Sequence, residues 1–528
     1  MASSGAVTRA PVPSLRVRAL NAEDLRTGGK YVLYWMIAAR RTHDNFALDR
    51  AIEHAKRLHK PLLVLEALRV AYPFASDRFH RFVIDGMADN AHAFQRAGIA
   101  YHPYVEPTAG AGRGLLQALA KDAAVVVSDD FPCFFLPQML AAAGQKLRVR
   151  LEAVDSNGVL PIRALDKACF RAFDFRRAVQ KSFAAHWAAR PAPAPLNRLT
   201  LPKLEFPKPI LERWPSASAE LLRGEPGALA ALAIDHDVPI VSYRGGFRAA
   251  NKTLAQFVEE KLDRYDEERN HPDKAATSGL SPYLHFGQLS AHRIVSAIAE
   301  REEWTPADLG DRTRGERTGF WKMHPSAEAF MDQLITWREV GFNHCAHRAD
   351  YKSFASLPNW AQKTLLEHKT DPRPQLYTRA QLEAARTHDP IWNAAQRELV
   401  REGRIHNYLR MLWGKKILEW SKTPEQALAT TLYLNDRYAL DGRDPNSYSG
   451  ILWCFGRYDR AWGPVRPIFG TVRYMSSENT GKKLWLAKYL ANFGEGGDLS
   501  PASQPKSRLG SAPRKHRQTA RPRTSAGR

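Results

Sequence analysis

The spacing of apolar and polar residues in the first third of the chain predicts a domain of alternating strands and helices. Continuous apolar runs, such as YVLYWM at 31–36 and LLVLEAL at 62–68, have the length and composition of buried strands. The expected strands are 31–36, 62–68, 101–105, 124–127 and 148–154. Amphipathic helical patterns separate them, near 44–59, 78–97 and 112–121. This alternation is typical of a doubly wound, largely parallel sheet, so we expect residues 29–165 to form an α/β domain.

The remaining residues divide into a linker, a helical region and two terminal segments. Residues 166–235 include a proline-rich stretch that cannot form a long helix, which indicates an extended interdomain linker. Residues 236–495 have a helical pattern almost throughout and predict an all-α domain. Residues 1–28 are expected to form a flexible arm, with a transit peptide as a less favoured interpretation. Residues 496–528 are rich in Gly, Ser, Pro and Arg and predict a disordered basic tail.

The composition is typical of a globular protein that stays inside the cell. No apolar run is long enough to cross a bilayer and no signal peptide is visible, so we expect neither a membrane partner nor secretion. The four cysteines lie far apart, without the spacing of a metal site or a disulfide framework. We therefore expect no metal and a reducing compartment, which is the cytoplasm and nucleoid in a bacterium or the nucleus in a eukaryote. No heptad or exposed apolar seam is visible, so a monomer is expected.

The net charge points to a polyanionic partner. The chain carries a formal charge of +22, and with the eight Lys and Arg residues of 501–528 set aside, +14 remains. Such a basic balance favours nucleic acid as the partner, the alternative being a solvated surface that serves only solubility.

Three tryptophans and a polar cluster are concentrated between residues 392 and 453. Trp413 and Trp420 lie seven residues apart on a strongly helical segment, so two turns place them on one face, and Trp392 precedes them. Indoles in series can carry single electrons to an aromatic cofactor, although a lone tryptophan is more often an ordinary core residue. The polar residues of this block are Arg410, Asn435, Asp436 and Asp441.

A second block, TSGLSPYLHFGQLS at 277–290, places small and hydroxyl residues at the start of a helix. Exposed N–H groups and hydroxyls at such a position can hold phosphate oxygens. Together the two blocks resemble the flavin-binding core of class II cyclobutane pyrimidine dimer photolyases, of the photolyase/cryptochrome family. The resemblance extends over residues 31–490. It implies an N-terminal α/β antenna domain and an all-α C-terminal domain that binds FAD.

The resemblance also assigns residues to the cofactor. Those matched to FAD binding are Tyr243, Thr277, Ser278, Leu280, Ser281, Asn393, Gln396, Arg410, Asn435, Asp436 and Asp441. In it, Arg410 and Asp441 form an ion pair beside the isoalloxazine ring, and Asn435 lies near the flavin N5. Trp413 corresponds to the electron donor next to the flavin, Trp392 to the middle one and Trp420 to the surface end. The active flavin would be the reduced form, and a deazaflavin or a folate could serve as the antenna.

A third block, FMDQLITWREVGFNHC at 330–345, supplies the residues matched to the lesion pocket. The catalytic residues carried over are Glu339, Asn343, Met411 and Trp453, and those carried over for DNA binding are Arg269, Arg338 and Trp453. A carboxyl group in a desolvated pocket can hydrogen-bond a pyrimidine edge, whereas a salt bridge is the alternative for Glu339. The chain departs from the family pattern at three positions, where it has Gly279, Phe342 and His344.

These features predict a DNA photolyase that repairs cyclobutane pyrimidine dimers in double-stranded DNA. Excited, reduced FAD would pass one electron to the flipped-out dimer, whose ring then splits. Two other classes remain open. One is a cryptochrome-like photoreceptor without repair activity, and the other is a flavin-free protein that binds nucleic acid through its basic surface.

Overall fold

The N-terminal domain is built on one six-stranded sheet, as the apolar runs predict. The structure is a computed structural model that describes residues 10–496, so the expectations for 1–9 and for the tail from 497 lie outside the described residues. The strands are β1 (Val17–Ala19), β2 (Tyr31–Met36), β3 (Leu62–Leu68), β4 (Ala100–Val105), β5 (Ala123–Asp129) and β6 (Leu151–Val154). Their order is β1-β6-β5-β2-β3-β4, and every pairing between neighbours other than that of β1 with β6 is parallel. The expected strands and the doubly wound fold are confirmed.

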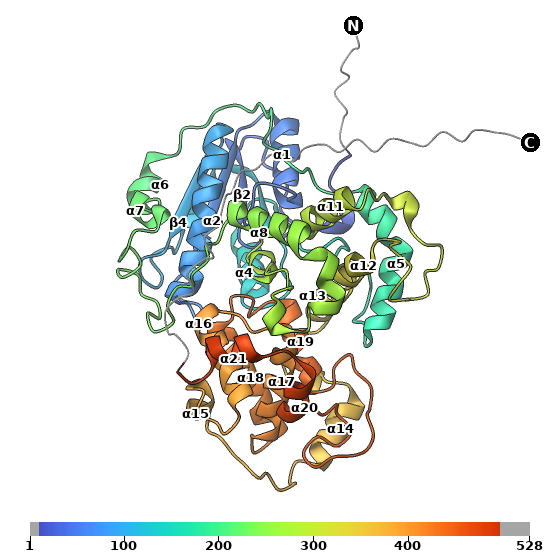
Figure 1. The fold of residues 1–528 in the computed structure, drawn as a ribbon. Helices are drawn as coiled ribbons and strands as arrows, with labels where there is room; N and C mark the ends of the chain where they lie inside the picture. The colour runs from blue at the N-terminus through green and yellow to red at the C-terminus, as the bar shows by residue number, and fades with distance from the viewer. Residues whose placement is uncertain (1–9, 497–528) are drawn as a thin grey trace, which may run out of the picture.

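Helices pack on both faces of this sheet, because each parallel connection must cross from one strand end to the next. They are α1 (Phe46–Leu58), α2 (Asp77–Arg96), α3 (Leu115–Lys121) and α4 (Leu136–Lys146). Asn45 caps α1, since its side-chain oxygen accepts hydrogen bonds from the amides of Ala47 and Leu48 at 3.0 and 3.2 Å. The sheet and its helices lie at the upper left in Figure 1.

The expectation of a flexible arm is wrong for residues 10–28. The short helix η1 (Ser14–Arg16) leads into β1, which pairs antiparallel with β6 at the edge of the sheet. The Arg16 side chain is 1% exposed, and its guanidinium donates to the carbonyls of Asp155, Gly158 and Val159. This buried cation anchors a segment whose composition alone indicates a loose start.

The expected linker also contains regular structure. Helix α5 (Ala172–Ala188) belongs to the helical domain, where Phe175, Phe183 and Trp187 are buried in its core. The shorter helices α6 (Lys208–Arg213) and α7 (Ala219–Arg223) lie against the sheet domain. The stretch between α5 and α6 contains no helix or strand, as its prolines predict, and residues 195–198 form a turn within it.

The rest of the chain is helical, as the pattern predicts. Its first part contains α8 (Phe247–Glu260), η2 (Leu262–Arg264), α9 (Tyr265–Glu268), η3 (Pro272–Lys274), α10 (Ser281–His285), α11 (Ala291–Arg301), η4 (Pro306–Asp308), α12 (Pro325–Met331), the π-helical turn η5 (Asp332–Trp337) and α13 (Arg338–His347). Its second part contains η6 (Phe354–Ser356), α14 (Asn359–Glu367), α15 (Arg379–Glu383), α16 (Pro390–Glu402), α17 (Asn407–Glu419), α18 (Pro424–Tyr438), α19 (Pro445–Cys454), α20 (Ser477–Lys483) and α21 (Ala487–Phe493). Figure 1 shows α14 to α21 gathered in the lower part of the molecule.

A buried arginine ties the two domains together. Arg78 on α2 donates hydrogen bonds to the carbonyls of Leu399 and Val400 near the end of α16 and of Tyr438 at the end of α18. A cation at helix C-termini complements the helix dipoles, and burial lowers the pKa of Arg78 to about 10. The helices that carry the tryptophan block are thereby fixed to the sheet domain. Within residues 10–496 no helix is long and apolar enough to span a membrane.

Candidate functional site

The three tryptophans of the central block form one continuous ring series. Trp392 lies on α16, Trp413 lies on α17, and Trp420 follows the end of α17. The rings of Trp392 and Trp413 stack with centroids 6.4 Å apart and planes within 6°, and Trp420 meets Trp392 edge-on at 5.5 Å. All three side chains are at most 2% exposed. Trp392 is therefore the central ring of the series, in the order that the sequence resemblance implies.

Two amides that the resemblance assigns to the cofactor hold this series in place. Gln396 accepts a hydrogen bond from the indole N–H of Trp413 at 2.9 Å and donates to the Glu383 carbonyl. Asn393 exchanges hydrogen bonds with the backbone and hydroxyl of Thr387, through both its oxygen and its nitrogen. These hydrogen bonds hold α16 and the Trp413 indole in place, and the contact of the two amides with FAD stays a prediction.

Trp420 is not the surface end of the series. It is 2% exposed, and two further rings cover it at centroid distances of 5.3 Å, those of Tyr377 and His388. Both residues precede α16, and His388 is exposed to solvent. The sequence resemblance did not point to either residue.

At the N-terminal end of α17, an ion pair lies beside a hydroxyl from a distant segment. Arg410 donates to the two carboxylate oxygens of Asp441 at 2.9 and 3.3 Å. Burial alone would raise the pKa of Asp441, but Arg410 and a hydrogen bond from Ser281 keep it below its ordinary value. The structure thus brings together Ser281, Arg410 and Asp441, as the resemblance implies.

A hydrogen bond connects the segment proposed to bind phosphate, residues 277–290, with Arg244, the neighbour of Tyr243. Tyr283, one turn into α10, donates its hydroxyl to the carbonyl of Arg244, and this brings Tyr243 next to the segment. The Tyr243 hydroxyl donates to the Glu402 carbonyl at 3.2 Å. Thr277 and Ser278 are half-buried, and Leu280 is 1% exposed in the hydrophobic core. Of the hydroxyls of this segment, that of Ser281 reaches the Arg410–Asp441 pair.

Asn435 and Asp436, at the end of α18, are both buried. The Asn435 amide nitrogen donates to the Ser447 hydroxyl at 2.8 Å. Asp436 accepts hydrogen bonds from the Arg443 amide and the Tyr448 hydroxyl, one on each oxygen. Asp436 therefore holds the turn at Arg443, and its contact with FAD stays a prediction.

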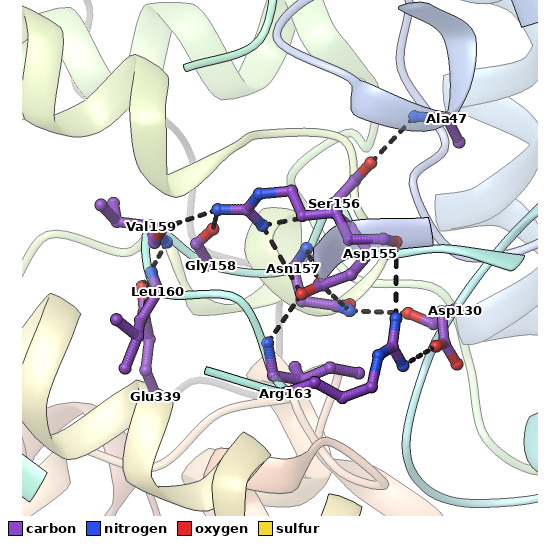
Figure 2. A network of polar contacts seen from close by, with 12 residues as sticks. Ala47, Asp130, Asp155, Ser156, Asn157, Gly158, Val159, Leu160, Arg163 and Glu339 are labelled. Atoms are coloured by element: carbon purple, nitrogen blue, oxygen red, sulfur yellow. Dashed lines mark hydrogen bonds and ion pairs between the residues drawn. The ribbon is translucent and has the colours of Figure 1, made fainter. Parts of the chain in front are cut away.

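Glu339 faces the segment between the two domains. Its two carboxylate oxygens accept the amides of Val159 and Leu160 at 2.7 and 2.9 Å, as Figure 2 shows. Burial raises the pKa of this carboxyl to about 7, against the opposing effects of Arg338 and of the two amides. One turn later on α13, Asn343 accepts from the Cys169 amide and donates to the Lys167 carbonyl. Both side chains hold the interdomain segment, and both also line one pocket of the protein, so the lesion-pocket role that the resemblance gives them stays a prediction.

Arg338 is likewise turned inward. It is 7% exposed, and its guanidinium stacks 4.5 Å from the ring centroid of Phe342. Its Nη1 atom has no hydrogen-bond partner within the described residues, and its role in DNA binding stays a prediction. Two of the three departures from the family pattern lie here: Phe342 pairs with Arg338 by a cation–π contact, and His344 is buried. Burial lowers the pKa of His344 to about 3, and its ring bonds to the Tyr351 carbonyl.

Met411 and Trp453 remain half-buried, as residues that line an open pocket must be. Two cations flank the Trp453 ring, Lys415 at 5.2 Å and Arg473 at 5.4 Å from its centroid. Lys415 is fully buried, donates to the Cys454 carbonyl at 2.6 Å, and has its pKa lowered to about 8 by burial. The sequence analysis missed Lys415, because its chain neighbours Gly414 and Lys416 give no local sign of burial.

Arg269, the remaining residue assigned to DNA, is half-buried and lies over the Tyr265 ring at 5.4 Å from its centroid. Its Nε atom is buried and has no hydrogen-bond partner within residues 10–496.

The residues around the Arg410–Asp441 pair fit FAD. The Nε atom of Arg410 is buried without a hydrogen-bond partner within the described residues, although the same guanidinium binds Asp441 through Nη2. A buried N–H donor normally has a hydrogen-bond acceptor, and a bound ligand can supply the acceptor that is missing here. The hydroxyls of Thr277, Ser278 and Ser281 suit a diphosphate, and the ion pair suits the polar edge of a flavin ring. Among residues 10–496 no group of three or more His, Cys, Asp or Glu is arranged to hold a metal ion.

Known proteins are similar in sequence to this chain over almost its whole length. No protein-family model matches the sequence. The chain is 36% identical, over 477 residues, to a Methanothermobacter thermautotrophicus protein named deoxyribodipyrimidine photo-lyase, which covers 90% of this chain and 97% of that protein. Proteins of the same name from Oryza sativa subsp. japonica and Potorous tridactylus are 33% and 32% identical. Each covers 90% of this chain, and the matches span 90% and 83% of those relatives.

Solved structures share the fold. A bacterial class III photolyase from Agrobacterium tumefaciens superposes with a TM-score of 0.62 at 17% identity, covering 88% of this chain and 86% of that one. A cryptochrome from Synechocystis superposes with a TM-score of 0.61 at 16% identity, covering 88% of each chain. The combination of an α/β domain and a helical domain in this chain is therefore the arrangement of those structures.

Proposed function

The chain belongs to the photolyase/cryptochrome family and is a light-dependent DNA-repair lyase, and we propose that it repairs cyclobutane pyrimidine dimers in double-stranded DNA, as class II members do. The observation that carries the proposal is the stacked pair of Trp392 on α16 and Trp413 on α17. Helix α17 also carries Arg410 and Met411. A flavin-free nucleic-acid-binding module would have no use for a series of buried indoles beside an ion pair.

The chain's residues would hold FAD in two places. Thr277, Ser278 and Ser281 would receive the diphosphate, while Arg410 and Asp441 would set the charge beside the flavin ring, with Asn435 and Tyr243 nearby. Bound FAD supplies light-driven single-electron chemistry. Because the Arg410–Asp441 pair is half-buried, water screens its charges less than those of an exposed pair, and the hydrogen bonds between them keep a fixed orientation.

The lesion pocket would be formed by the half-buried residues Met411 and Trp453. Trp453 offers a flat surface on which a flipped pyrimidine pair can stack, and a damaged pair costs less to unstack than intact bases. Lys415 and Arg473 place positive charge behind that surface, where it favours an electron that arrives on the dimer. The net positive charge of the chain draws it to the phosphates, an attraction that weakens as salt is added.

The indole series would serve a separate task, the delivery of electrons that keep the cofactor reduced. Trp413, Trp392 and Trp420 are packed without space for water, so electrons move between rings that barely rearrange. An antenna pigment, a deazaflavin or a folate, would belong to the α/β domain, and the absorption spectrum of the purified protein would identify it. We propose that the protein acts as a monomer on DNA in the nucleoid or the nucleus.

The test is repair of a thymine-dimer oligonucleotide by purified protein whose flavin has been reduced chemically, in blue light and in darkness. Restoration of intact thymines only in the light supports the proposal, and an oligonucleotide with a (6–4) photoproduct should stay unchanged. A protein that binds flavin and photoreduces it but restores no thymine would be a photoreceptor of the cryptochrome kind instead.

A further inference from the structure

The buried indole series continues beyond Trp420 to a tyrosine–histidine pair. The ring of Tyr377 meets Trp420 edge-on, with centroids 5.3 Å apart, and the His388 ring lies at the same distance from Trp420. The Tyr377 amide donates to the Trp420 carbonyl at 3.3 Å, which fixes the tyrosine against the indole. His388 is exposed, whereas Trp420 is 2% exposed, so the pair connects the buried series with solvent.

The hydrogen bonds of Tyr377 suit the release of its phenolic proton. The hydroxyl oxygen accepts the backbone amide of His388 at 3.1 Å. The same hydroxyl lies 2.6 Å from Nδ1 of the His388 ring. A neutral imidazole with its hydrogen on the solvent-facing Nε2 accepts the phenolic proton at Nδ1, and it can pass charge to water from its other nitrogen.

The charges around Trp420 favour passing an electron vacancy onward. Lys416 places its ammonium 5.6 Å from the centroid of the Trp420 ring, where a cation opposes positive charge on that ring. Glu419 pairs with Lys416 at 2.7 Å and offsets part of this effect. Oxidation of Tyr377 with transfer of its proton leaves a neutral ring and moves the positive charge to the exposed imidazole. Charge at that position is stabilised by water.

We propose that Tyr377 is the terminal electron donor of the relay and that His388 is its proton acceptor. Light-driven transfer of one electron from Trp413 to the oxidised flavin leaves a vacancy that passes through Trp392 to Trp420. Tyr377 then gives one electron to the Trp420 cation radical, which returns to neutral tryptophan. The phenolic O–H bond breaks, its proton binds Nδ1 of His388, and a neutral tyrosyl radical and an imidazolium remain. A thiol reductant in solution returns a hydrogen atom to the tyrosine.

This proposal rests on the proposed flavin photochemistry, and its test uses the FAD-loaded full chain with oxidised flavin and a thiol under blue light. The readouts are the tyrosyl radical trapped by freezing and detected by electron paramagnetic resonance, and the yield of reduced flavin. Tyr377→Phe keeps the ring and removes the hydroxyl, so it should lose the tyrosyl signal and most of the yield. Tyr474→Phe is the matched control, because that ring packs on Phe469 outside the relay.

His388→Ala should also lose most of the tyrosyl signal, and imidazole added to the buffer should restore it, since position 388 is open to solvent. Imidazole should not restore Tyr377→Phe. Wild-type yield and signal in either variant would overturn the assignment. Dimer repair with chemically reduced flavin separates the two proposals: a wild-type protein that repairs but gives no tyrosyl signal overturns the relay alone, and one that binds no flavin overturns both.

Discussion

Trp392 and Trp413 are joined twice. Their rings stack at 6.4 Å, and the indole N–H of Trp392 donates to the backbone carbonyl of Trp413 at 3.0 Å. The second indole N–H, that of Trp413, is held by Gln396 on the helix of Trp392. Two helices are therefore locked so that neither ring can turn without breaking a buried hydrogen bond, which costs about 1–3 kcal/mol for each unsatisfied group. The electronic contact between the rings is fixed by the fold before any cofactor binds.

Replacement of Trp413 by phenylalanine should separate photoreduction from repair. The ring nearest the ion pair would then be hard to oxidise, so illumination of the oxidised protein should yield little reduced flavin. Repair with flavin reduced by dithionite should stay at the wild-type rate, because that reaction does not use the relay. Absorbance changes under blue light and a thymine-dimer assay measure the two. Trp485→Phe, at an exposed position, is the control and should change neither. Loss of repair in Trp413→Phe with reduced flavin would contradict the separation of roles.

Replacement of Asp441 by asparagine should destabilise the protein and weaken FAD binding. The change leaves the half-buried Arg410 without its counter-charge, so the loss should be smaller than that from a fully buried pair, about 3–5 kcal/mol. The folded-state pKa of Asp441 lies below its ordinary value, so its contribution is present above the unfolded pKa and is lost as pH falls through the folded pKa. Urea unfolding should show the wild-type advantage at neutral pH shrinking under strongly acidic conditions. Equal stability of both proteins at neutral pH would show that the pair contributes nothing.

The fold could be read from the sequence wherever burial follows local periodicity. The strands β2, β3 and β5 are continuous apolar runs, and such runs have few alternatives to a sheet covered on both faces. Strand β1 could not be predicted, because it depends on the burial of Arg16 against carbonyls from residues far along the chain. Helix α5 was hidden by the prolines that follow it. Its burial is decided by contacts with η5, where Arg176 pairs with Asp332, and local composition does not record such contacts.

The site was predictable in its ring series and less so in its carboxylates. Residues seven apart lie on one face of a helix, so the spacing of Trp413 and Trp420 predicted that their rings lie in one series, as they do. Glu339 and Asn343 follow the π-helical turn at Asp332–Trp337, and a wider turn changes which face the later residues present. Periodicity of 3.6 residues cannot anticipate that change. The partners of Asn393 and Gln396 are likewise tertiary, because amides bind whichever donor the packing brings near.

Removal of the Glu339 carboxylate should loosen the contact between the domains. In Glu339→Ala the amides of Val159 and Leu160 lose their acceptors, at about 1–3 kcal/mol for each buried group. Urea unfolding should therefore show a loss of about 2–6 kcal/mol, while repair per folded molecule with reduced flavin persists if Glu339 acts only in that contact. Glu367→Ala, which removes an exposed carboxylate, is the control and should leave stability near that of the wild type. A repair defect in fully folded Glu339→Ala would support the lesion-pocket role of this residue.

The same carboxyl should make stability depend on pH. Its pKa is raised by burial to about 7 in the folded protein, above the value of about 4.3 for an unperturbed glutamate. Between these two values the unfolded state binds fewer protons, so the wild type should lose stability as pH rises through that range. In Glu339→Gln the group cannot ionise, and this part of the pH dependence should disappear. An unchanged slope in Glu339→Gln would mean that other groups govern stability there.

Lys415 should make repair fall as pH rises through about 8. Burial lowers its pKa to about 8, and its ammonium lies 5.2 Å from the Trp453 ring centroid, with Arg473, Asp459 and Cys454 as the other titratable neighbours. At an effective dielectric of about 20, the Lys415 charge attracts an electron on the stacked lesion by of order 1–2 kcal/mol. Loss of that attraction should slow repair about tenfold. Lys415→Met should show the low rate at every pH.

Stability should move in the opposite direction from repair. The folded pKa of Lys415 is depressed below the unfolded value of about 10.4, so the unfolded state binds more protons between the two values and the wild type gains stability as pH rises through them. Lys415→Met should lack that gain, and Lys363→Met, at an exposed position, should keep it. Repair rates with reduced flavin and urea unfolding, both followed from pH 7 to 10.5, measure the two effects on the same samples. A rate that stays constant across that range in the wild type would show that the Lys415 charge does not reach the lesion. A missing gain in stability would show that the folded-state pKa of Lys415 is not lowered, so that the lysine stays charged in the folded protein as it does in the unfolded chain.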